Sequence, residues 1–437
     1  MFKRILSVFF ILYCVSLATT MAGMEPFGYG FTAFVIFYWA FARQKSSVPV
    51  RRLDGSDAKI EWAFLLMIAI VIIGAFTSPH LPIKYRIDVV GQQRWIPLLY
   101  ALTAWLVASP ALASGDSEGH VVLPKAFWIL FICYSVAVLF GIAQSLFNIG
   151  FFFRPAYDIP PDVYGHLTVW RARGFFSNTM SFSYCLGQIA CYAYAFYLAA
   201  NLPNKKRRWL LAIFIWLTLG IVFTFTRGAW LGAMFAFVSV AFLHRKKLGV
   251  KVAAGIVALL VALSIFSSGI RMRLKSIIHE PTGQVSVAQR FQVWHVNLRM
   301  FEDHPWFGIG YGYNYYYTPE YNLKVLGHPA FAGNAHNNFL EVLAGCGIFG
   351  FFVWLWICGY FFWRTWRLFV ESPPGSFAHS LALGSLGAQI FFHFGGLTQT
   401  TFFDAKNTHV LILGWAFVLA QDFLRKYRQG AGEARFA

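Results

Sequence analysis

Residues 60–77 read IEWAFLLMIAIVIIGAFT, a run whose one ionisable residue is Glu61. A helix that crosses a bilayer core needs about 17–25 predominantly apolar residues, so this run predicts a membrane span. Similar runs recur along a chain with 58% hydrophobic residues, 12% charged residues and a mean hydropathy of +0.56. That composition leaves too little polar surface for a water-soluble globule, and we expect lipid to be the main solvent.

Twelve apolar runs of this kind predict an all-α, polytopic membrane protein with about 12 transmembrane helices. The chain from 1 to 437 is interpreted as a single transmembrane domain. The first run follows Lys3 and Arg4 but has a poor small-residue cleavage site, so we expect a retained helix and no cleaved signal peptide. The runs start near Ile5, Phe27, Ile60, Trp95, Ala126, Asn178, Trp209, Ala229, Val250, Asn337, Phe377 and Thr408.

The formal net charge of +18 comes from basic residues in short clusters between the apolar runs. Strongly basic connectors occur at alternate positions, as the preference of Lys and Arg for the cytoplasmic side requires. This distribution predicts cytoplasmic termini and argues against nucleic-acid binding. The clusters are Lys3 with Arg4, 43–59, 205–208, 245–247, Arg364 with Arg367, and 425–428.

Two connectors on the opposite, outward side are long: residues 148–177 and residues 268–336. Long loops carry function more often than short ones, so we expect the site there. Residues 268–336 are predicted to form a loop subdomain, inserted between the ninth and tenth helices and containing short amphipathic helices. One such helix should rest on the outer membrane surface and end at Asp303-His304-Pro305. Its apolar stripe comprises Val287, Phe291, Trp294, Leu298 and Phe301, at spacings of four and three.

Two arginines in this half of the chain are candidates for anion binding. Arg227 lies in the minimal connector Thr226-Arg227-Gly228, and Arg290 lies on the edge of the apolar stripe. A guanidinium group is always charged and can hold phosphate oxygens through two parallel hydrogen bonds. The alternatives are an interfacial arginine that snorkels to water for Arg227 and a solvated helix-surface charge for Arg290.

His336 lies in the segment 334–341, which closes the long loop and opens the tenth helix. The positive end of the helix dipole lowers the pKa of a histidine, and a neutral imidazole is what a general base requires. A histidine that only caps or packs is the alternative. Gly345, Gly347 and Gly350 follow, and we interpret them as small residues for close helix packing.

The long loop is also rich in aromatic residues. Such rings can form platforms for sugar faces, and they can equally form an interfacial belt. The sequence leaves both interpretations open. The residues are Trp306, Tyr311, Tyr313, Tyr315, Tyr316, Tyr317 and Tyr321.

These motifs together resemble the bacterial O-antigen ligase and polymerase superfamily. His336-Asn337 is followed after nine residues by Gly347-Ile348-Phe349-Gly350, as in the C-terminal motif of that family. Residues 226–232, Arg290 with Trp294, and residues 303–310 complete the match in family order. The resemblance covers about residues 226–350. The N-terminal half matches mainly in hydropathy and in Arg171-Ala172-Arg173-Gly174-Phe175.

The resemblance implies a glycosyltransferase of the bacterial inner membrane whose site faces the periplasm. It implies an O-antigen ligase, which transfers a glycan from undecaprenyl pyrophosphate to the lipid A-core of lipopolysaccharide by an inverting, metal-independent reaction without a cofactor. His336 corresponds to the essential histidine of the family, and Arg227 and Arg290 correspond to its essential arginines. From their position in the other long outward loop, Arg171 and Arg173 would add charge near the pyrophosphate, with solvated loop-surface arginines as the alternative. Asp404, near the final outward connector, is a candidate to orient His336.

Several alternatives stay open at this point. An O-antigen or exopolysaccharide polymerase would use the same lipid-linked donor, and a protein O-oligosaccharyltransferase is a more distant relative. A transporter of lipid-linked oligosaccharide would suit twelve spans, although transporters tend to place ionisable groups near the bilayer midplane. A metal enzyme lacks ligand motifs such as HExxH, and the six cysteines lie in apolar stretches without CxxC spacing. The loop residues considered as metal ligands are His295, Glu302, Asp303, His304, His328 and His336.

Overall fold

A computed structural model describes most of the chain. The described residues are 2–19, 21–42, 55–78, 81–108, 122–149, 162–164, 167–266, 287–328 and 333–436. Parts of both long predicted loops, 150–161 and 267–286, lie outside them, as do most of the predicted basic connector 43–59 and of the connector 110–125.

The first half of the described chain is helical apart from one short hairpin. Its elements are α1 (Phe2–Thr19), α2 (Met21–Ala42), α3 (Gly55–Thr77), α4 (Ile83–Gly91), η2 (Gln92–Arg94), α5 (Trp95–Val107), α7 (Val122–Phe147), β1 (Asp162–Tyr164), β2 (Leu167–Val169), α8 (Thr179–Ala199) and α9 (Asn204–Phe223). The second half comprises α10 (Arg227–His244), α11 (Lys246–Phe266), α13 (Val287–Asp303), α14 (Asn314–Leu326), α15 (Asn338–Glu371), α16 (Phe377–Gly395), η4 (Thr401–Phe403) and α17 (Ala405–Phe436).

The twelve predicted apolar runs each coincide with a helix among the described residues: α1, α2, α3, α5, α7, α8, α9, α10, α11, α15, α16 and α17. In the same part of the chain, five segments are long and apolar enough to cross a membrane. They are Lys59–Thr77, Pro124–Phe147, Arg227–His244, Asn338–Glu371 and Ala405–Tyr427. The helical fold class is confirmed and the apolar helices indicate a membrane protein, whereas the count of twelve spans stays a prediction.

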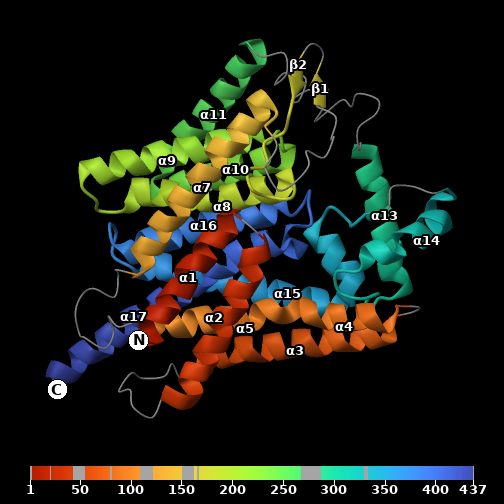
Figure 1. Ribbon diagram of the computed structural model, residues 1–437, viewed down its shortest axis with the longest axis horizontal. Helices are drawn as coiled ribbons and strands as arrows, with labels where there is room; N and C mark the ends of the chain where they lie inside the picture. Colours follow the sequence, from red (N-terminus) through yellow and green to blue (C-terminus); the bar gives the residue numbers. More distant parts are fainter. Residues whose placement is uncertain are drawn as a thin grey trace.

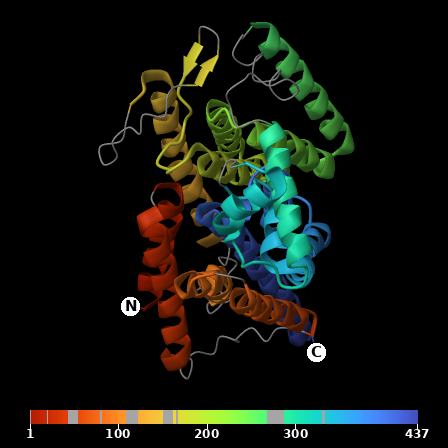
Figure 2. The ribbon, with the colours of Figure 1, turned by 90° about the vertical axis from the view of Figure 1, so that its right-hand side faces the viewer.

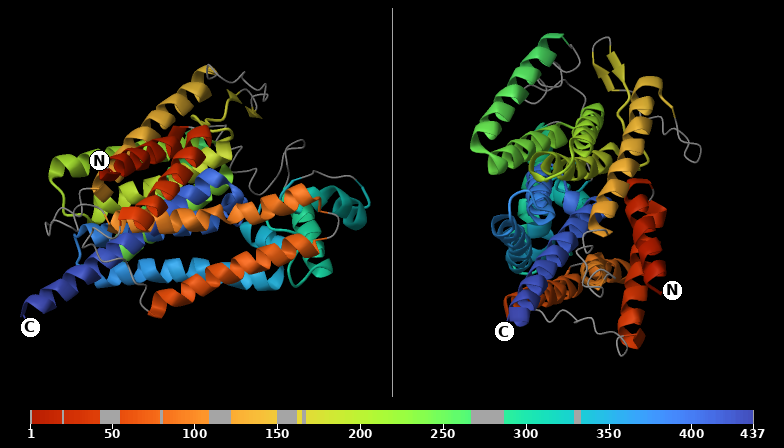
Figure 3. Two further views of the ribbon diagram at one scale, coloured as in Figure 1. Left: turned by 60° about the horizontal axis from the view of Figure 1, so that its bottom comes forward. Right: turned by 90° about the vertical axis from the view of Figure 1, so that its left-hand side faces the viewer.

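The helices form a bundle with two distinct ends. Two of the longer helices, α3 and α15, run along the long axis of the molecule in Figure 1. α13 and α14 lie together at one end, and the C-terminal part of α17 extends from the other (Figures 1 and 3). Figure 2 faces the first end and shows α13 and α14 in front of the bundle. α13 packs against both α14 and α15, so these loop helices are fixed to the bundle.

The bundle is held by a continuous buried apolar core. α8 packs against α9, α10 and α16, and α5 packs against α17. Phe361 of α15 stacks on Trp415 of α17 with ring centroids 4.1 Å apart, and each ring is 1% exposed. Other large apolar side chains, such as Phe352 at 61% exposed, point outward. An apolar outer surface suits contact with lipid.

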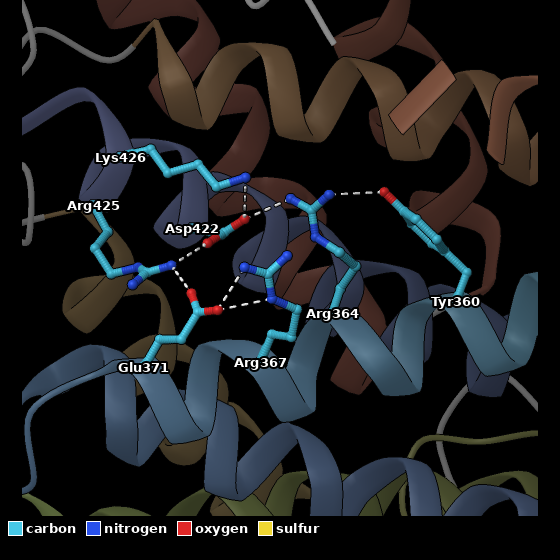
Figure 4. A network of polar contacts seen from close by, with 7 residues as sticks. All are labelled: Tyr360, Arg364, Arg367, Glu371, Asp422, Arg425 and Lys426. Carbon is cyan, nitrogen blue, oxygen red and sulfur yellow. Dashed lines mark hydrogen bonds and ion pairs between the residues drawn. The ribbon is translucent and has the colours of Figure 1, made fainter. Parts of the chain in front are cut away.

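An ion-pair network joins α15 and α17 at the end away from α13 (Figure 4). Arg364 and Asp422 are 4% and 5% exposed, and their nearest side-chain nitrogen and oxygen are 2.5 Å apart. Arg425 donates to Asp422 and to Glu371, so it links the buried pair to the surface. The network unites two of the basic connectors that charge alternation predicts on one side of the membrane.

The hairpin of β1 and β2 is not predicted by the sequence analysis. The two strands pair antiparallel, with Val163 opposite Thr168 and Tyr164 opposite Leu167. β-branched and aromatic residues favour this conformation, but strands of three residues are too short to give a recognisable alternating pattern.

The predicted amphipathic helix in the long loop is confirmed as α13, which ends at Asp303 as expected. Part of its predicted apolar stripe is exposed, and contact of this face with the outer membrane surface stays a prediction. Phe291 and Leu298 from that stripe are 59% and 42% exposed, whereas Val296 and Met300 are fully buried. The helix therefore carries two apolar faces, and the one that contacts the protein core is not the stripe identified from the spacing.

Candidate functional site

Arg227 is the first residue of α10 and follows directly on the connector Thr224–Thr226. Gly228, the next residue, packs closely against side chains of two other segments. A Cβ atom at Gly228 would lie 2.3 Å from Thr398 Oγ1 and 2.6 Å from the hydroxyl of Tyr184. Only glycine permits this contact without a shift of the neighbours, so Arg227 is adjacent to the point where α8, α10 and the α16–α17 connector meet.

Arg290 lies in the first turn of α13 and is half-buried. Its positive charge acts on the hydroxyl of Tyr184 and on the ring of His336. The same tyrosine hydroxyl lies against Gly228, beside Arg227. The three predicted site residues, which are far apart along the chain, are thus brought to one region around Tyr184.

His336 precedes α15 and is held by a hydrogen bond to the α16–α17 connector. Its Nδ1 atom is 2.9 Å from the carboxamide Oε1 of Gln399. An oxygen can only accept here, so Nδ1 carries the proton and Nε2 has the lone pair of a neutral imidazole. The structure therefore presents His336 in the tautomer that a general base requires at Nε2.

The pKa of His336 is lowered from its ordinary value of 6.5. Burial of the ring is the largest cause, because desolvation disfavours the imidazolium form, and the positive charge of Arg290 lowers the pKa further. The hydrogen bond to Gln399 acts in the opposite direction. The direction agrees with the sequence-based expectation, but burial and Arg290 supply causes beyond the expected helix dipole.

Two asparagines after His336 attach the start of α15 to the α16–α17 connector. Asn337 caps α15 by accepting from the backbone N–H groups of Phe339 and Leu340. The backbone N–H of Asn338 donates to the Gly396 carbonyl oxygen over 2.7 Å, and its side chain bonds to both Thr401 and the Phe402 N–H. These bonds position the connector so that Gln399 reaches His336.

A buried polar chain links the helix of Arg290 to the helix that follows His336. The Asn314 amide nitrogen donates to Asn297 Oδ1 of α13 over 2.7 Å and to the Glu341 carbonyl oxygen of α15 over 3.2 Å. The Glu341 carboxylate in turn accepts the backbone N–H of Ala335 over 2.7 Å. Asn297, Asn314 and Glu341 are at most 1% exposed. These hydrogen bonds connect α13, α14 and α15 directly, so structure outside the site contributes to the spacing between Arg290 and His336.

The segment 303–310, which belongs to the family-like motifs of the sequence, packs into a break in α15. Gly347 has φ +65° and ψ −170°, which interrupts the helix. The freed backbone groups bond to the motif: Ile309 N–H to the Ala344 carbonyl, and Ile348 N–H to the Pro305 carbonyl. The expectation of close packing at Gly345 and Gly347 is correct in kind, but the partner is this loop segment and not another helix.

Arg171 braces the connector in front of Arg227. Its guanidinium nitrogens donate to the Thr224 carbonyl oxygen and to Thr226 Oγ1, each over 3.0 Å. Arg173 is half-buried nearby, and its backbone N–H donates to the Gln144 side chain. The structure thus brings Arg171 next to Arg227, with at least part of its hydrogen-bonding capacity used by the protein itself.

Asp404 does not take the role expected for it. Its carboxylate accepts from the Ser181 hydroxyl and from the backbone N–H of Asn407. The hydrogen bond to His336 Nδ1 comes from Gln399 instead. The prediction that Asp404 orients His336 is therefore corrected: Asp404 begins α17 and ties it to α8, and a neutral carboxamide stands at the histidine.

Several other ionisable residues of α13 and α14 form ion pairs. Arg299 pairs with Glu302 over 2.8 Å and with Asp303 over 3.3 Å, and Lys324 also pairs with Asp303. Within the described ranges, no group of three His, Cys, Asp or Glu side chains lies close enough together to hold a metal ion.

Tyr184, Thr398 and Gln399 are site residues that the sequence analysis missed. The signal for two of them is the polar run Thr398-Gln399-Thr400-Thr401 between two apolar helices. Tyr184 gives no signal, because it lies in an apolar helix whose neighbours are visible only after folding.

The apolar helices indicate a membrane protein, and the bundle places Arg227, Arg290 and His336 near Tyr184 and Gln399. Residues 212–355 of this chain match the family model described as O-antigen ligase. The match spans Arg227, Arg290 and His336 and confirms the predicted resemblance to the O-antigen ligase superfamily. Members of this family are glycosyltransferase-like ligases and polymerases. No curated protein matches the chain significantly.

Proposed function

We propose that the protein is an O-antigen ligase of the bacterial inner membrane. It would transfer a glycan from undecaprenyl pyrophosphate to the lipid A-core of lipopolysaccharide, at a site that faces the periplasm. The observation that carries the proposal is the grouping of Arg227, Arg290 and His336 around Tyr184 and Gln399. The family match covers all three residues.

In this proposal Arg227 and Arg290 bind the diphosphate of the donor. Guanidinium groups hold phosphate oxygens in a fixed geometry and stay charged at every relevant pH. The bond between the anomeric carbon and the diphosphate oxygen breaks during the reaction, and negative charge grows on the departing diphosphate. Fixed positive charges stabilise this leaving group without reorganisation. Arg171 and Arg173 would contribute additional positive charge beside the Arg227 connector.

His336 would act as the general base. As the acceptor hydroxyl oxygen attacks the anomeric carbon from the face opposite the diphosphate, its proton passes to Nε2 of His336. The proton on Nδ1 stays in the hydrogen bond to Gln399. A lowered pKa keeps the imidazole neutral and able to accept a proton at neutral pH.

A polymerase is the nearest alternative because it uses the same donor and differs in its acceptor. The histidine motif and the expected twelve spans favour the ligase. One experiment separates these functions from transport. The purified protein is given lipid-pyrophosphate-linked glycan and lipid A-core in the presence of a chelator. Glycan joined to lipid A supports the ligase, longer lipid-linked glycan supports the polymerase, and movement of donor across a bilayer without a new bond would contradict both.

Replacement of His336 by alanine tests the proposed base. The variant His336→Ala should lose about a hundredfold or more of the transfer rate while it still binds the donor. Arg227→Gln and Arg290→Gln should weaken donor binding as well as the rate. The exposed His295 of α13 provides a matched control, since His295→Ala should leave transfer unchanged. Equal turnover of the His336→Ala variant and the unchanged protein would rule out the proposed base.

A further inference from the structure

Two basic segments lie at the end of the bundle away from the candidate site. The connector 224–226, next to Arg227, joins the end of α9 to the start of α10. These helices contain 20 and 18 residues, so each extends about 27–30 Å from that connector. The start of α9 and the end of α10 therefore lie far from Arg227. Residues 205–208 open α9, and residues 245–247 span the junction of α10 and α11.

Folding brings these two segments together into one surface. α10 packs against both α9 and α11 (Figure 1). The positive charges of Arg207, from α9, and of Arg245, from the junction, both act on the ring of His244. Eight exposed basic side chains form what we term the basic surface: Lys205, Lys206, Arg207, Arg208, Arg245, Lys246, Lys247 and Lys251.

Among the described residues, the basic surface lacks carboxylate partners. The sequence contains no Asp or Glu between Asp162 and Glu280. The ion pairs of the described chain involve none of these eight side chains. The network of α15 and α17 differs, because Asp422 and Glu371 offset part of its positive charge (Figure 4). Like charges at one surface repel one another, so the basic surface favours an anionic partner from outside the chain.

Exposed apolar side chains begin directly beside the basic surface. On α9, Trp209 and Ile215 are 59% and 57% exposed, and on α11, Val250 and Val257 are 65% and 58% exposed. Apolar side chains on the outside of such helices suit contact with lipid tails, and tryptophan is enriched at the level of lipid headgroups. The basic surface therefore lies at the depth where the phosphate groups of membrane lipids are found.

We propose that the basic surface binds the phosphate headgroups of anionic phospholipids. Guanidinium and ammonium groups form charge-assisted hydrogen bonds to phosphate oxygens. Clusters of Lys and Arg beside membrane helices attract anionic lipids, which are abundant in the cytoplasmic leaflet. Charge alternation predicts the cytoplasmic side for this end of the bundle. The inference does not depend on the proposed glycosyl transfer, since it concerns the end of the bundle opposite Arg227.

Lipid binding by the full-length protein in detergent, measured by native mass spectrometry, tests the proposal. The probes are phosphatidylglycerol, which is anionic, and phosphatidylcholine, which is zwitterionic. The unchanged protein should bind phosphatidylglycerol more tightly by about tenfold or more. Two double variants, Lys205→Gln with Lys206→Gln and Lys246→Gln with Lys247→Gln, should each lower that affinity about tenfold, because each removes two charges. Lys205→Arg with Lys206→Arg keeps both charges and should keep the affinity.

Arg299→Gln with Lys324→Gln is the matched control. This variant also removes two exposed positive charges, but they pair with Glu302 and Asp303 on α13, so phosphatidylglycerol should bind within about twofold of the unchanged protein. An excess of inorganic phosphate should not displace the lipid, because the apolar border holds its acyl chains. Equal affinity of the unchanged protein for both lipids, an equal loss in the control, or displacement by inorganic phosphate would overturn the proposal.

Discussion

His336 is held in a backbone conformation that few residues other than glycine adopt. Its φ is +46°, in the left-handed region where side chains are normally disfavoured. The strain is offset by bonds on both sides: Ala335 donates to the buried Glu341 carboxylate, and Asn337 caps α15. Strained residues held by their surroundings are frequent at functional sites. The same bonds direct the imidazole ring of His336 at Gln399. The hydrogen bond to Gln399 then keeps the ring proton on Nδ1.

Substitutions of Gln399 should move the pH dependence of transfer in opposite directions. Gln399→Glu places a carboxylate at Nδ1, which favours imidazolium and raises the pKa of His336. The acidic limb of the transfer rate, where the base becomes protonated, then moves to higher pH. Gln399→Leu removes a hydrogen bond that raises the pKa, so the limb moves to lower pH, and the maximal rate falls because the ring loses its orientation.

The measurement is kcat/KM as a function of pH for the unchanged protein and both variants, because this quantity reports the pKa values of the free enzyme. The lowered pKa of His336 predicts an acidic limb below 6.5 in the unchanged protein. It also predicts that folding stability falls as pH drops through about 6.5, since the unfolded chain then binds a proton that the folded protein resists. Limbs at the same pH in all three proteins would show that Gln399 does not act on the base.

At the scale of elements, the break in α15 decides how the loop motif is attached. Gly347 interrupts the helix, and a Cβ atom there would lie 2.4 Å from the Trp306 carbonyl group. Trp306 and Phe349 stack across the break with centroids 5.6 Å apart. Neither a straight helix nor a side chain at this position would leave room for the motif.

Gly347→Ala should therefore destabilise the protein and reduce transfer. The positive φ costs about 1–3 kcal/mol for a non-glycine residue, and the contact with Trp306 forces a backbone shift in addition. The thermal unfolding midpoint in detergent measures the effect.

Gly359→Ala is the matched control on the same helix. Nothing lies within 4 Å of a Cβ atom at Gly359, and alanine in a helix interior is favoured over glycine by about 0.5–1 kcal/mol. A midpoint that is unchanged or raised is expected for this variant. A similar loss in both variants would show that the α15 break has no special role.

At the scale of the whole molecule, the two ends of the bundle carry different polar structures. One end gathers the candidate site beneath α13 and α14. The other carries the ion-pair network of α15 and α17 (Figure 4). α15 and α17 both run between the two ends. The network therefore holds together, far from the site, the same two helices that begin near it at Asn338 and Ala405. We therefore expect the polar groups at the site to act in the reaction and those of the network to act in stability.

Asp422→Asn should destabilise the protein without an effect on the chemistry of the site. The change leaves Arg364 buried and deprived of its charge partner, which costs about 3–5 kcal/mol. The thermal unfolding midpoint should fall, while the transfer rate per folded molecule stays the same. Glu302→Gln, at the exposed Arg299 pair, should leave the midpoint unchanged. An unaltered midpoint for Asp422→Asn would mean that the network does not hold the two helices together.

The helices and the main candidate residues were predictable from the sequence because their signals are local. Apolar runs of membrane length, a helix that ends before Pro305, and motifs that contain Arg227, Arg290 and His336 depend only on neighbouring residues. The break at Gly347 and the role of Gln399 were not predictable in this way, because each depends on contacts between segments distant in the chain. Asp404 illustrates the difference. Its charge and position suggested that it would bond to His336, but in the folded protein the carboxamide of Gln399 occupies that position.

By itself, the sequence determined an apolar helical chain that resembles the O-antigen ligase superfamily and carries Arg227, Arg290 and His336 as candidate site residues. Only the tertiary structure decided which side chains surround these residues, such as Gln399 at His336 and Tyr184 at Gly228. The physical reason is that hydrophobic length and motif spacing act along the chain, whereas burial, hydrogen-bond partners and pKa values arise from groups that folding brings together.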